Sequence, residues 1–341
     1  MGRNCVSASR VVRISVVLFL LLVVVIVLSV TIGPADIGIV RGLKSLFGGW
    51  RVGKTGLTPA ERTILFSIRL PRVLFAGLVG AALSAAGVVF QALLRNPLAD
   101  PYILGISSGA AVGAIIGIIV GAAVIPFGVP FLAFAGAAVT VIVVFAIGKT
   151  RRRIESNTLL LAGVIVNAFF SAVIMFLISV ADNTDLHNIT FWLMGNLSLV
   201  TVREIALLLV FSFGGFAVIY TYARHLNCLV IGEETALQLG INVERTKVIL
   251  FLAASLMTGV AVSFGGVIGF VGLIIPHVMR MLFGSDHRLV LPTSFLFGAS
   301  FLAVADTIAR TAVSHNELPV GVITALCGAP YFIYLLRRRA V

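Results

Sequence analysis

The sequence contains few charged residues for its length. Only 11% of its 341 residues are Asp, Glu, Lys or Arg, whereas soluble domains carry about 25%. Hydrophobic residues make up 60% of the chain, and the mean hydropathy is +1.13. These values exclude an ordinary soluble enzyme and a disordered or collagen-like chain, because the aliphatic runs are too long and too frequent for a buried core. The composition therefore indicates a polytopic membrane protein.

Cysteine and the common metal-binding and redox motifs are also scarce. The three cysteines, Cys5, Cys228 and Cys327, have no paired spacing, so they define neither a disulfide framework nor a metal site. The sequence contains no H-E-x-x-H or C-x-x-C motif, and the five histidines fall near the ends of apolar runs or in loops. We therefore predict that the chain is not an enzyme, and that it has no catalytic residue, metal site or bound cofactor of its own.

The formal net charge of +12 arises from basic residues in short loops between apolar runs. This pattern is typical of the cytoplasmic side of a membrane protein rather than of a nucleic-acid-binding surface. We therefore predict no nucleic-acid partner. With the N-terminus inside, most Lys and Arg lie on the inner side, so the charge distribution predicts that both termini are cytoplasmic.

Long apolar runs predict an all-α protein with about ten membrane-spanning helices of about 20 residues each. The first run, residues 14–32, is longer than a signal-peptide core and lacks a clean cleavage site, so we interpret it as a retained span. We treat residues 1–341 as a single transmembrane domain. The predicted spans cover residues 13–32, 69–94, 102–121, 130–148, 158–181, 202–222, 247–264, 267–283, 290–311 and 319–336.

A weak internal repeat relates the two halves of the chain. Its copies begin in the second and seventh predicted spans, which cross the membrane in opposite directions. Two halves of inverted topology are a common transporter architecture. The matching residues are Gly80, Ala82, Ser84, Gly87, Val88 and Pro97 in the first copy, and Gly259, Ala261, Ser263, Gly266, Val267 and Pro276 in the second.

Charged residues within the predicted spans bear on the energy source. Asp306 and Arg310 lie four residues apart near the outer end of the ninth span and are expected to pair on one helix face. An ion-coupled carrier usually needs buried carboxylates as its ion site, and this chain has very few. The sequence therefore favours an energy source in a separate subunit, with an ion-coupled secondary transporter as the alternative.

The longest polar segment on the predicted inner side covers residues 224–247. Within it, residues 232–240 are predicted to form a short helix that Gly240 ends. Its acidic residues and the apolar Leu237 and Leu239 suit a docking surface, and a simple connector is the alternative. Because most other inner loops are short, we predict that this segment binds a cytoplasmic partner.

Short motifs in order along most of the chain carry a family resemblance. They are 68–72 (IRLPR), 79–84 (VGAALS), 91–101 (QALLRNPLADP), 104–109 (LGISSG), 159–163 (LLLAG), 191–195 (FWLMG), 232–240 (GEETALQLG), 269–280 (GFVGLIIPHVMR), 285–288 (SDHR), 305–306 (AD), 309–310 (AR), 317–319 (ELP) and 328–330 (GAP). Together they resemble the permease subunits of ABC importers for iron chelates and cobalamin, the FecCD-type family. The motifs are specific for the family but not for one cargo.

The resemblance implies a function and a set of partners. The expected function is import of a ferric siderophore, haem or cobalamin across a prokaryotic cytoplasmic membrane, with iron chelates favoured because the family serves them most broadly. Two ABC ATPase subunits, which bind ATP and Mg²⁺, are expected at the inner face. A periplasmic or lipid-anchored substrate-binding protein is expected at the outer face. The second permease subunit is expected to be another copy of the chain, with a heterodimer as the alternative.

The resemblance also assigns roles to individual residues. Arg310 and, less closely, Arg62 match outer arginines that face acids on the binding protein. If Arg310 docks the binding protein, we expect Asp306→Ala to matter less than Arg310→Glu. The inner turn that forms the cytoplasmic gate corresponds to Ser156, Asn157 and Thr158. Within the coupling segment 224–247, the residues expected to contact the ATPase are Glu233, Glu234, Ala236, Leu239 and Gly240.

Overall fold

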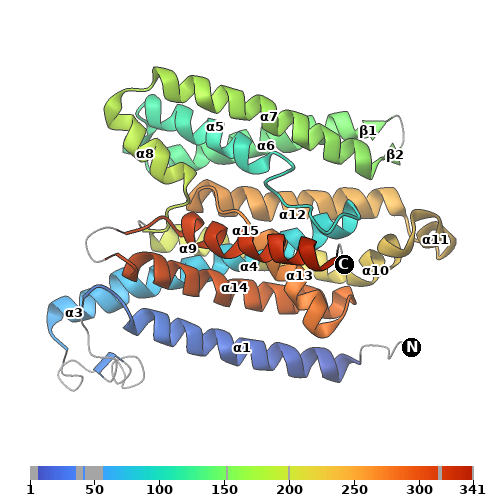
Figure 1. The fold of residues 1–341 in the computed structure, drawn as a ribbon, viewed down its shortest axis with the longest axis horizontal. Coiled ribbons are helices and arrows are strands. Elements are labelled where there is room, and N and C mark those ends of the chain that lie inside the picture. Colours follow the sequence, from blue (N-terminus) through green and yellow to red (C-terminus); the bar gives the residue numbers. More distant parts are fainter. Residues whose placement is uncertain are drawn as a thin grey trace.

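The computed structural model describes residues 7–35, 41–42, 57–150, 153–198, 200–313 and 317–339 (Figure 1). The first half of the chain forms α1 (Ala8–Thr31), α3 (Pro59–Thr63), η1 (Ile64–Arg69), α4 (Leu70–Leu93), α5 (Ile106–Ile119), η2 (Ala122–Val124) and α6 (Gly128–Gly148). Two short strands, β1 (Lys149–Thr150) and β2 (Arg153–Ile154), form an antiparallel pair. The second half forms α7 (Ser156–Val180), α8 (Asn183–Leu193), α9 (Val202–Thr221), α10 (Ala223–Ile231), α11 (Glu233–Gln238), α12 (Val243–Gly265), α13 (Val271–Phe283), α14 (His287–Thr311) and α15 (Val320–Arg339).

The helices coincide with the predicted spans. Among the described residues, seven helices are long and apolar enough to cross a membrane, and three shorter apolar helices, α5, α13 and the Val320–Tyr334 part of α15, add to them. Each predicted span overlaps one of these helices. Apart from the β1–β2 pair, the regular structure of the described residues is helical. The chain is therefore an all-helical, multi-pass membrane protein.

The second span begins earlier than the sequence predicts. Its helix starts at Pro59 rather than near residue 69, because Thr58 and Glu61 form a capping box: Thr58 Oγ1 accepts the N–H of Glu61 at 3.3 Å, and Glu61 accepts the N–H of Thr58 at 2.7 Å. The π-helical turn η1 then joins α3 to α4 without a break. The charged residues in this stretch lower its hydropathy, so an apolar-run search misses the first turns of the helix.

Helix α4 forms the centre of the bundle. In the most apolar stretch of Pro59–Leu93, 89% of the residues are buried, against 6% for α1, which lies at one edge of the bundle (Figure 1). Helices α12, α13 and α14 pack against α4. Glycines make this close approach possible: a Cβ at Gly80 would overlap the carbonyl of Gly298, and a Cβ at Gly87 would overlap the carbonyl of Gly272. Small residues of this kind let helix backbones approach closely in membranes.

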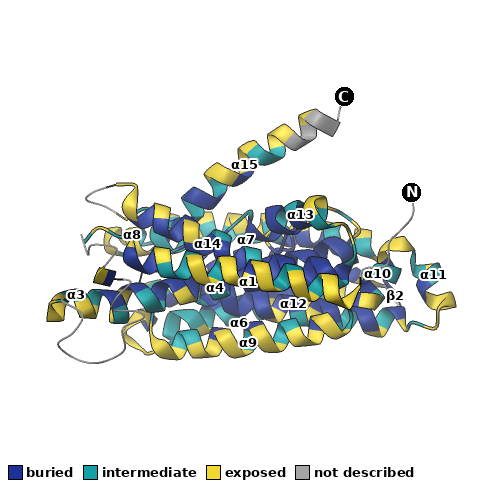
Figure 2. Cartoon of the chain, turned by 90° about the horizontal axis from the view of Figure 1, so that it is seen from below, coloured by how far each residue is buried: buried dark blue, intermediate teal, exposed yellow. Residues whose placement is uncertain are grey.

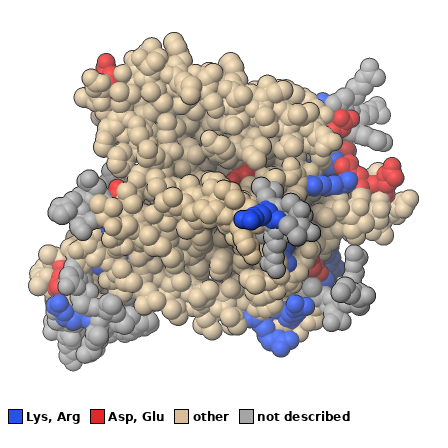
Figure 3. Space-filling model, viewed as in Figure 1, with Lys and Arg blue, Asp and Glu red and all other residues tan. Residues whose placement is uncertain are grey.

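The two ends of the bundle differ. In Figure 1, α3 and α8 lie at one end, and β1, β2 and α11 lie at the other; α1 begins and α15 ends toward the α11 end. On the face shown in Figure 3, most Lys, Arg, Asp and Glu gather toward the two ends, and the middle is largely uncharged. Such a belt suits the hydrocarbon core of a membrane, where exposed charge is costly. In Figure 2, the last turns of α15 stand away from the other helices.

Two helices are too short to cross a bilayer alone. Helix α5 has 14 residues and α13 has 13, which is about 20 Å of helix against a hydrocarbon core about 30 Å thick. The loop 94–105 joins α4 to α5, and the loop 266–270 joins α12 to α13. Helices α4 and α5, like α12 and α13, therefore form a long helix, a loop and a short helix, and the loops must cover part of the membrane depth. The predicted repeat register is not matched residue by residue, because Gly87 lies within α4 whereas Gly266 lies after α12.

Candidate functional site

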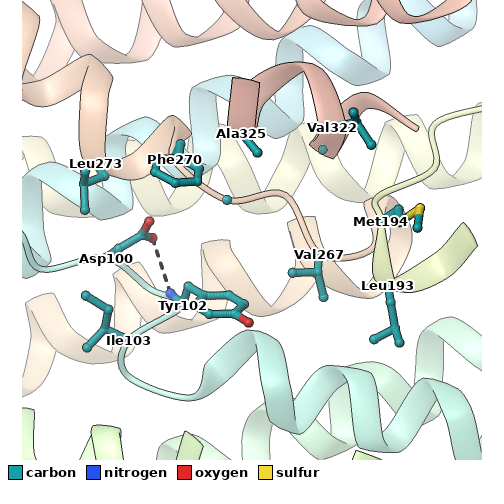
Figure 4. A pocket seen from close by; sticks show the side chains of 12 residues that line it. Asp100, Tyr102, Ile103, Leu193, Met194, Val267, Phe270, Leu273, Val322 and Ala325 are labelled. Atoms are coloured by element: carbon teal, nitrogen blue, oxygen red, sulfur yellow. Dashed lines mark hydrogen bonds between the residues drawn. The ribbon is translucent and has the colours of Figure 1, made fainter. Parts of the chain in front are cut away.

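A cavity of about 520 Å³ lies where the two loops meet (Figure 4). Its walls are mostly apolar, and among the residues that line it Asp100 is the one with a charged side chain. Both halves of the chain therefore contribute to a single cavity. The lining residues are Asp100, Tyr102 and Ile103 of the first loop; Leu193 and Met194 after α8; Val267, Gly269 and Phe270 of the second loop; Leu273 of α13; and Gly321, Val322 and Ala325 of α15.

Asp100 shapes the first loop. It is 9% exposed, and its Oδ1 accepts the backbone N–H of Tyr102 at 3.3 Å (Figure 4). Its backbone carbonyl accepts the N–H of Ile103 at 3.0 Å. These local hydrogen bonds fold residues 100–103 into a turn, which presents Tyr102 and Ile103 to the cavity.

Backbone hydrogen bonds between distant segments hold the opposite wall. The carbonyls of Met194 and Gly195 accept the N–H groups of Gly321 and Val320, both at 3.1 Å, so the start of α15 is fixed to the end of α8. Phe270, which precedes α13, has a φ of +69°, a left-handed conformation that is uncommon for a non-glycine residue. Strained backbone of this kind is frequent at functional sites.

A buried amide joins the two halves beside the cavity. Gln91 of α4 donates from Nε2 to the carbonyls of Gly272 and Leu273, at 3.1 and 3.3 Å. Its Oε1 accepts a hydrogen bond from Arg280 of α13. Gln91 therefore fixes the first turn of α13 to the end of α4.

A buried ion-pair network lies near the α3 end of the bundle. Arg72 of α4 contacts Asp306 of α14, with Nη2 to Oδ1 at 2.9 Å, and also contacts Glu317, with Nη1 to Oε2 at 2.6 Å. The predicted pair of Asp306 and Arg310 exists, but at 3.9 Å it is the longer contact of the carboxylate. The sequence reasoning missed Arg72, because its partners lie more than two hundred residues away along the chain.

The two predicted docking arginines lie in different environments. Arg62 of α3 is exposed. Arg310 is only 3% exposed, and it donates to the carbonyl of Ser29 and to Thr307 Oγ1. In this conformation Arg310 faces the bundle rather than a partner, so a docking role would require its side chain to leave this network.

The predicted coupling helix forms at α11. Gly240 ends it in a left-handed conformation, with a φ of +79°. The N–H of Ile241 donates to the carbonyl of Ala236 at 3.0 Å, and that of Gly240 to Leu237 at 2.9 Å, which together make a Schellman motif. Ala236 is buried, whereas Leu237 and Leu239 are 55% and 64% exposed. Glu234 is exposed and Glu233 is half-buried.

Ion pairs anchor the first turn of α11. Glu233 contacts Lys247 of α12 at 2.8 Å and Arg95, just after α4, at 3.5 Å. Lys247 also donates to the carbonyl of Ile154 in β2 at 2.6 Å. Lys247 could not be identified from the sequence, because a single lysine at the start of an apolar run gives no indication of the groups that it contacts.

The predicted gate residues form the first turn of α7 and do not line the 520 Å³ cavity. Ser156 Oγ donates to the carbonyl of Leu93, the last residue of α4, at 2.8 Å. Thr158 Oγ1 donates to Glu155 at 3.0 Å, and Asn157 is exposed. The turn is therefore fixed to α4 and lies two residues beyond β2.

The turn between α13 and α14 carries a charged cap. Asp286 Oδ1 accepts hydrogen bonds from Asn227 Nδ2 at 2.9 Å and from the N–H of Arg288 at 3.0 Å. Partial burial opposes ionisation of this carboxyl, but the hydrogen bonds from Arg288 and Asn227 outweigh it and lower the pKa of Asp286 to about 2.

Within the described ranges, no group of three or more His, Cys, Asp or Glu residues is placed to hold a metal ion. The features that stand out are instead an apolar cavity lined by two loops from different parts of the chain and a short helix, α11, with exposed leucines. In membrane transporters, substrate sites typically lie where discontinuous helices and irregular backbone meet. The fold and site therefore define a multi-pass membrane transport protein.

The family is shown by comparison with known proteins. The model of the FecCD transport family matches residues 21–338, so the chain belongs to this family, which is one of transport proteins and not of enzymes. The cobalamin import system permease protein BtuC of Halobacterium salinarum is 45% identical over 286 residues, 84% of this chain and 76% of that protein. The hemin transport system permease protein HmuU of Yersinia pestis is 40% identical over 299 residues, 84% of this chain and 86% of that protein.

A solved structure is also similar. It is described as an inward-facing conformation of a metal-chelate type ABC transporter, and it matches with a TM-score of 0.81 at 32% identity. The match covers 96% of this chain and 99% of that one. Sequence and fold comparisons therefore agree on the family that the motifs indicate.

Proposed function

We propose that this chain is the membrane-spanning permease subunit of an ATP-driven, binding-protein-dependent importer of a metal chelate. The observation that carries the proposal is the cavity between the two loops, in a chain of the FecCD transport family. The relatives named for cobalamin and hemin transport support a cobalt or iron chelate as cargo. A ferric siderophore belongs to the same chemical class, and the apolar lining suits a large chelate with little exposed charge.

The proposed topology has about ten spans with the α11 end in the cytoplasm of a prokaryote. Helix α1 begins and α15 ends toward that end (Figure 1), which supports cytoplasmic termini. The whole chain then forms one transmembrane domain, with residues 224–247 as its cytoplasmic coupling segment. A second permease subunit, expected to be another copy of the chain, would complete the pathway.

We propose a different partner for each end of the helix bundle. ABC ATPase subunits, which bind ATP and Mg²⁺, would dock on α11 through Glu233, Glu234, Leu239 and Gly240, with Ala236 packing the helix against the bundle. The neighbouring exposed side chains of Leu237 and Leu239 support this, since they offer an apolar contact to a partner. At the other end, Arg62 would meet acids of a substrate-binding protein. We propose that the permease itself binds no cofactor.

Reconstitution tests the proposal. The permease, purified with its ATPase and binding protein, is placed in liposomes, and uptake of haem, cyanocobalamin and a ferric siderophore is measured with and without ATP. We expect uptake of at least one chelate that requires both ATP and the ATPase. Uptake by the permease alone, driven by a proton or sodium gradient, would instead establish the secondary transporter.

A further inference from the structure

Lys247 occupies a buried junction between the coupling helix and the gate. Its side chain is 5% exposed, and Nζ lies 2.8 Å from Glu233 Oε2 in α11. The same ammonium donates to the carbonyl of Ile154 in β2 at 2.6 Å. One side chain of α12 therefore contacts two segments that are 79 residues apart in the sequence, since 233 − 154 = 79.

Because the side chain of Lys247 is buried, its ammonium depends on the two groups that it contacts. A lysine ammonium has three donors and no acceptor, and burying it costs free energy unless a counter-charge and hydrogen bonds compensate. Here the carboxylate of Glu233 supplies the counter-charge, and Ile154 supplies a carbonyl acceptor. Moving either segment alone would leave the buried ammonium with only one of these two partners, which favours movement of the two segments together.

A second contact ties β2 to the same helix. Glu244 of α12, one turn before Lys247, accepts the N–H of Ile154 at 3.0 Å. Ile154 is thus held at both its N–H and its carbonyl by two side chains of α12. Ser156, which begins α7, follows two residues later and donates to Leu93 of α4. A shift of β2 therefore reaches the first turn of α7 directly.

The other contact of Glu233 is weaker. Arg95 lies 3.5 Å from the carboxylate and is 40% exposed, so solvent and salt screen that pair. The pair with the buried Lys247 is screened less. Of the two ion pairs of Glu233, the one with Lys247 is therefore the less screened, and Lys247 also contacts β2.

We propose that Lys247 is the positioning residue that transmits movement of the coupling helix α11 through β2 to the cytoplasmic gate at the start of α7. This inference rests on the proposed roles of α11 and of residues 156–158. It predicts that removal of the ammonium uncouples ATP hydrolysis by the partner from opening of the gate, while the ATPase still binds.

The test uses Lys247→Met, which keeps the length and apolar stem of the side chain but removes its charge. Arg13→Met is the control, because Arg13 of α1 is exposed, lies outside the coupling segment 224–247 and makes no ion pair with the described residues. Lys247→Arg restores the charge. Each variant is purified as the complete complex, with Asn157→Cys as a reporter and the native cysteines replaced by serine.

Two quantities are measured: chelate transported per ATP hydrolysed, and the rate at which a maleimide labels position 157 with and without ATP and vanadate. We expect Lys247→Met to lower transport per ATP by about tenfold, and to abolish the nucleotide-dependent change in labelling. Arg13→Met should match the parent complex, and Lys247→Arg should restore most of the transport per ATP and of the labelling change. The thermal stability of each complex is also measured, so that loss of transport can be distinguished from misfolding of the variant.

The outcomes distinguish the inference from the function on which it rests. If the parent shows a nucleotide-dependent labelling change and Lys247→Met retains it, transmission through Lys247 is wrong. If Lys247→Met and Arg13→Met are equally impaired, the effect is not specific to the junction and the inference is also wrong. If the unmutated complex, with Asn157 and the native cysteines in place, transports no chelate, the proposed function fails first.

Discussion

Arg72 of α4 and Asp306 of α14 form a bidentate ion pair in the buried part of the bundle. Nη2 lies 2.9 Å from Oδ1, and Nε lies 3.0 and 3.1 Å from the two carboxylate oxygens. Both side chains are almost fully buried, and Glu317, which is 49% exposed, completes the network from the segment before α15. The pair therefore joins the central helix to α14 through a geometry that favours Arg over Lys.

Asp306→Ala is expected to destabilise the permease strongly. It leaves the buried Arg72 and Arg310 without their shared carboxylate, and breaking a buried ion pair costs about 3–5 kcal/mol. The expectation that Asp306→Ala matters less than Arg310→Glu, if Arg310 docks the binding protein, stays a prediction about transport, whereas this prediction concerns stability. Thermal unfolding in detergent measures the loss. The double variant Arg72→Met/Asp306→Leu should lose clearly less stability than Asp306→Ala; an equal loss would mean that packing rather than charge dominates this site.

Gly87→Ala is expected to disturb the contact between α4 and α13. The added Cβ would overlap the carbonyl of Gly272, and overpacking of a close contact costs about 1–3 kcal/mol. Gly214→Ala on α9 is the control, because open space surrounds its Cβ position. We expect a lower melting temperature for the first variant and an unchanged or slightly higher one for the second. Equal melting temperatures would show that the two helices separate easily.

Leu239→Arg is expected to weaken binding of the ATPase without unfolding the permease. Leu239 is largely exposed next to α11, so the change costs little in the free chain, whereas loss of an apolar anchor weakens docking by about tenfold or more. Affinity is measured by biolayer interferometry in detergent. Val124→Arg, a similar exposed change at the opposite end of the bundle, should leave affinity unchanged, and an equal effect of both would argue against docking on α11.

Asp286 should make stability depend on pH. Its folded pKa of about 2 lies below the ordinary value of 3.8, so its ionised form stabilises the fold above about pH 4, and this contribution is lost as the pH falls toward 2. Asp286→Asn keeps the shape but not the charge. We expect the parent to be more stable than this variant by no more than about 2 kcal/mol at pH 6, with the difference shrinking below pH 4. A difference that stays constant down to pH 3 would contradict the depressed pKa.

Much of the fold was predictable from local patterns. The predicted spans all overlap observed helices, because the hydrocarbon core sets both the length and the apolar character of a membrane helix. Helix α11 was also predictable: Gly240 adopts the left-handed conformation that ends a helix at low cost. The start at Pro59 was not, because Glu61 and Arg62 interrupt the apolar signal while the capping box still forms.

The sequence by itself determined the class of protein, the helices and the family, because each depends on patterns within a few dozen adjacent residues. Only the tertiary structure decided which distant groups meet. It placed Asp100 and Phe270 around one cavity, paired Arg72 with Asp306, and turned Arg310 toward the bundle. It also brought Lys247 to Ile154. The physical reason is that a buried charge must find a partner in space, and the helix packing that brings the partner near leaves no local pattern in the chain.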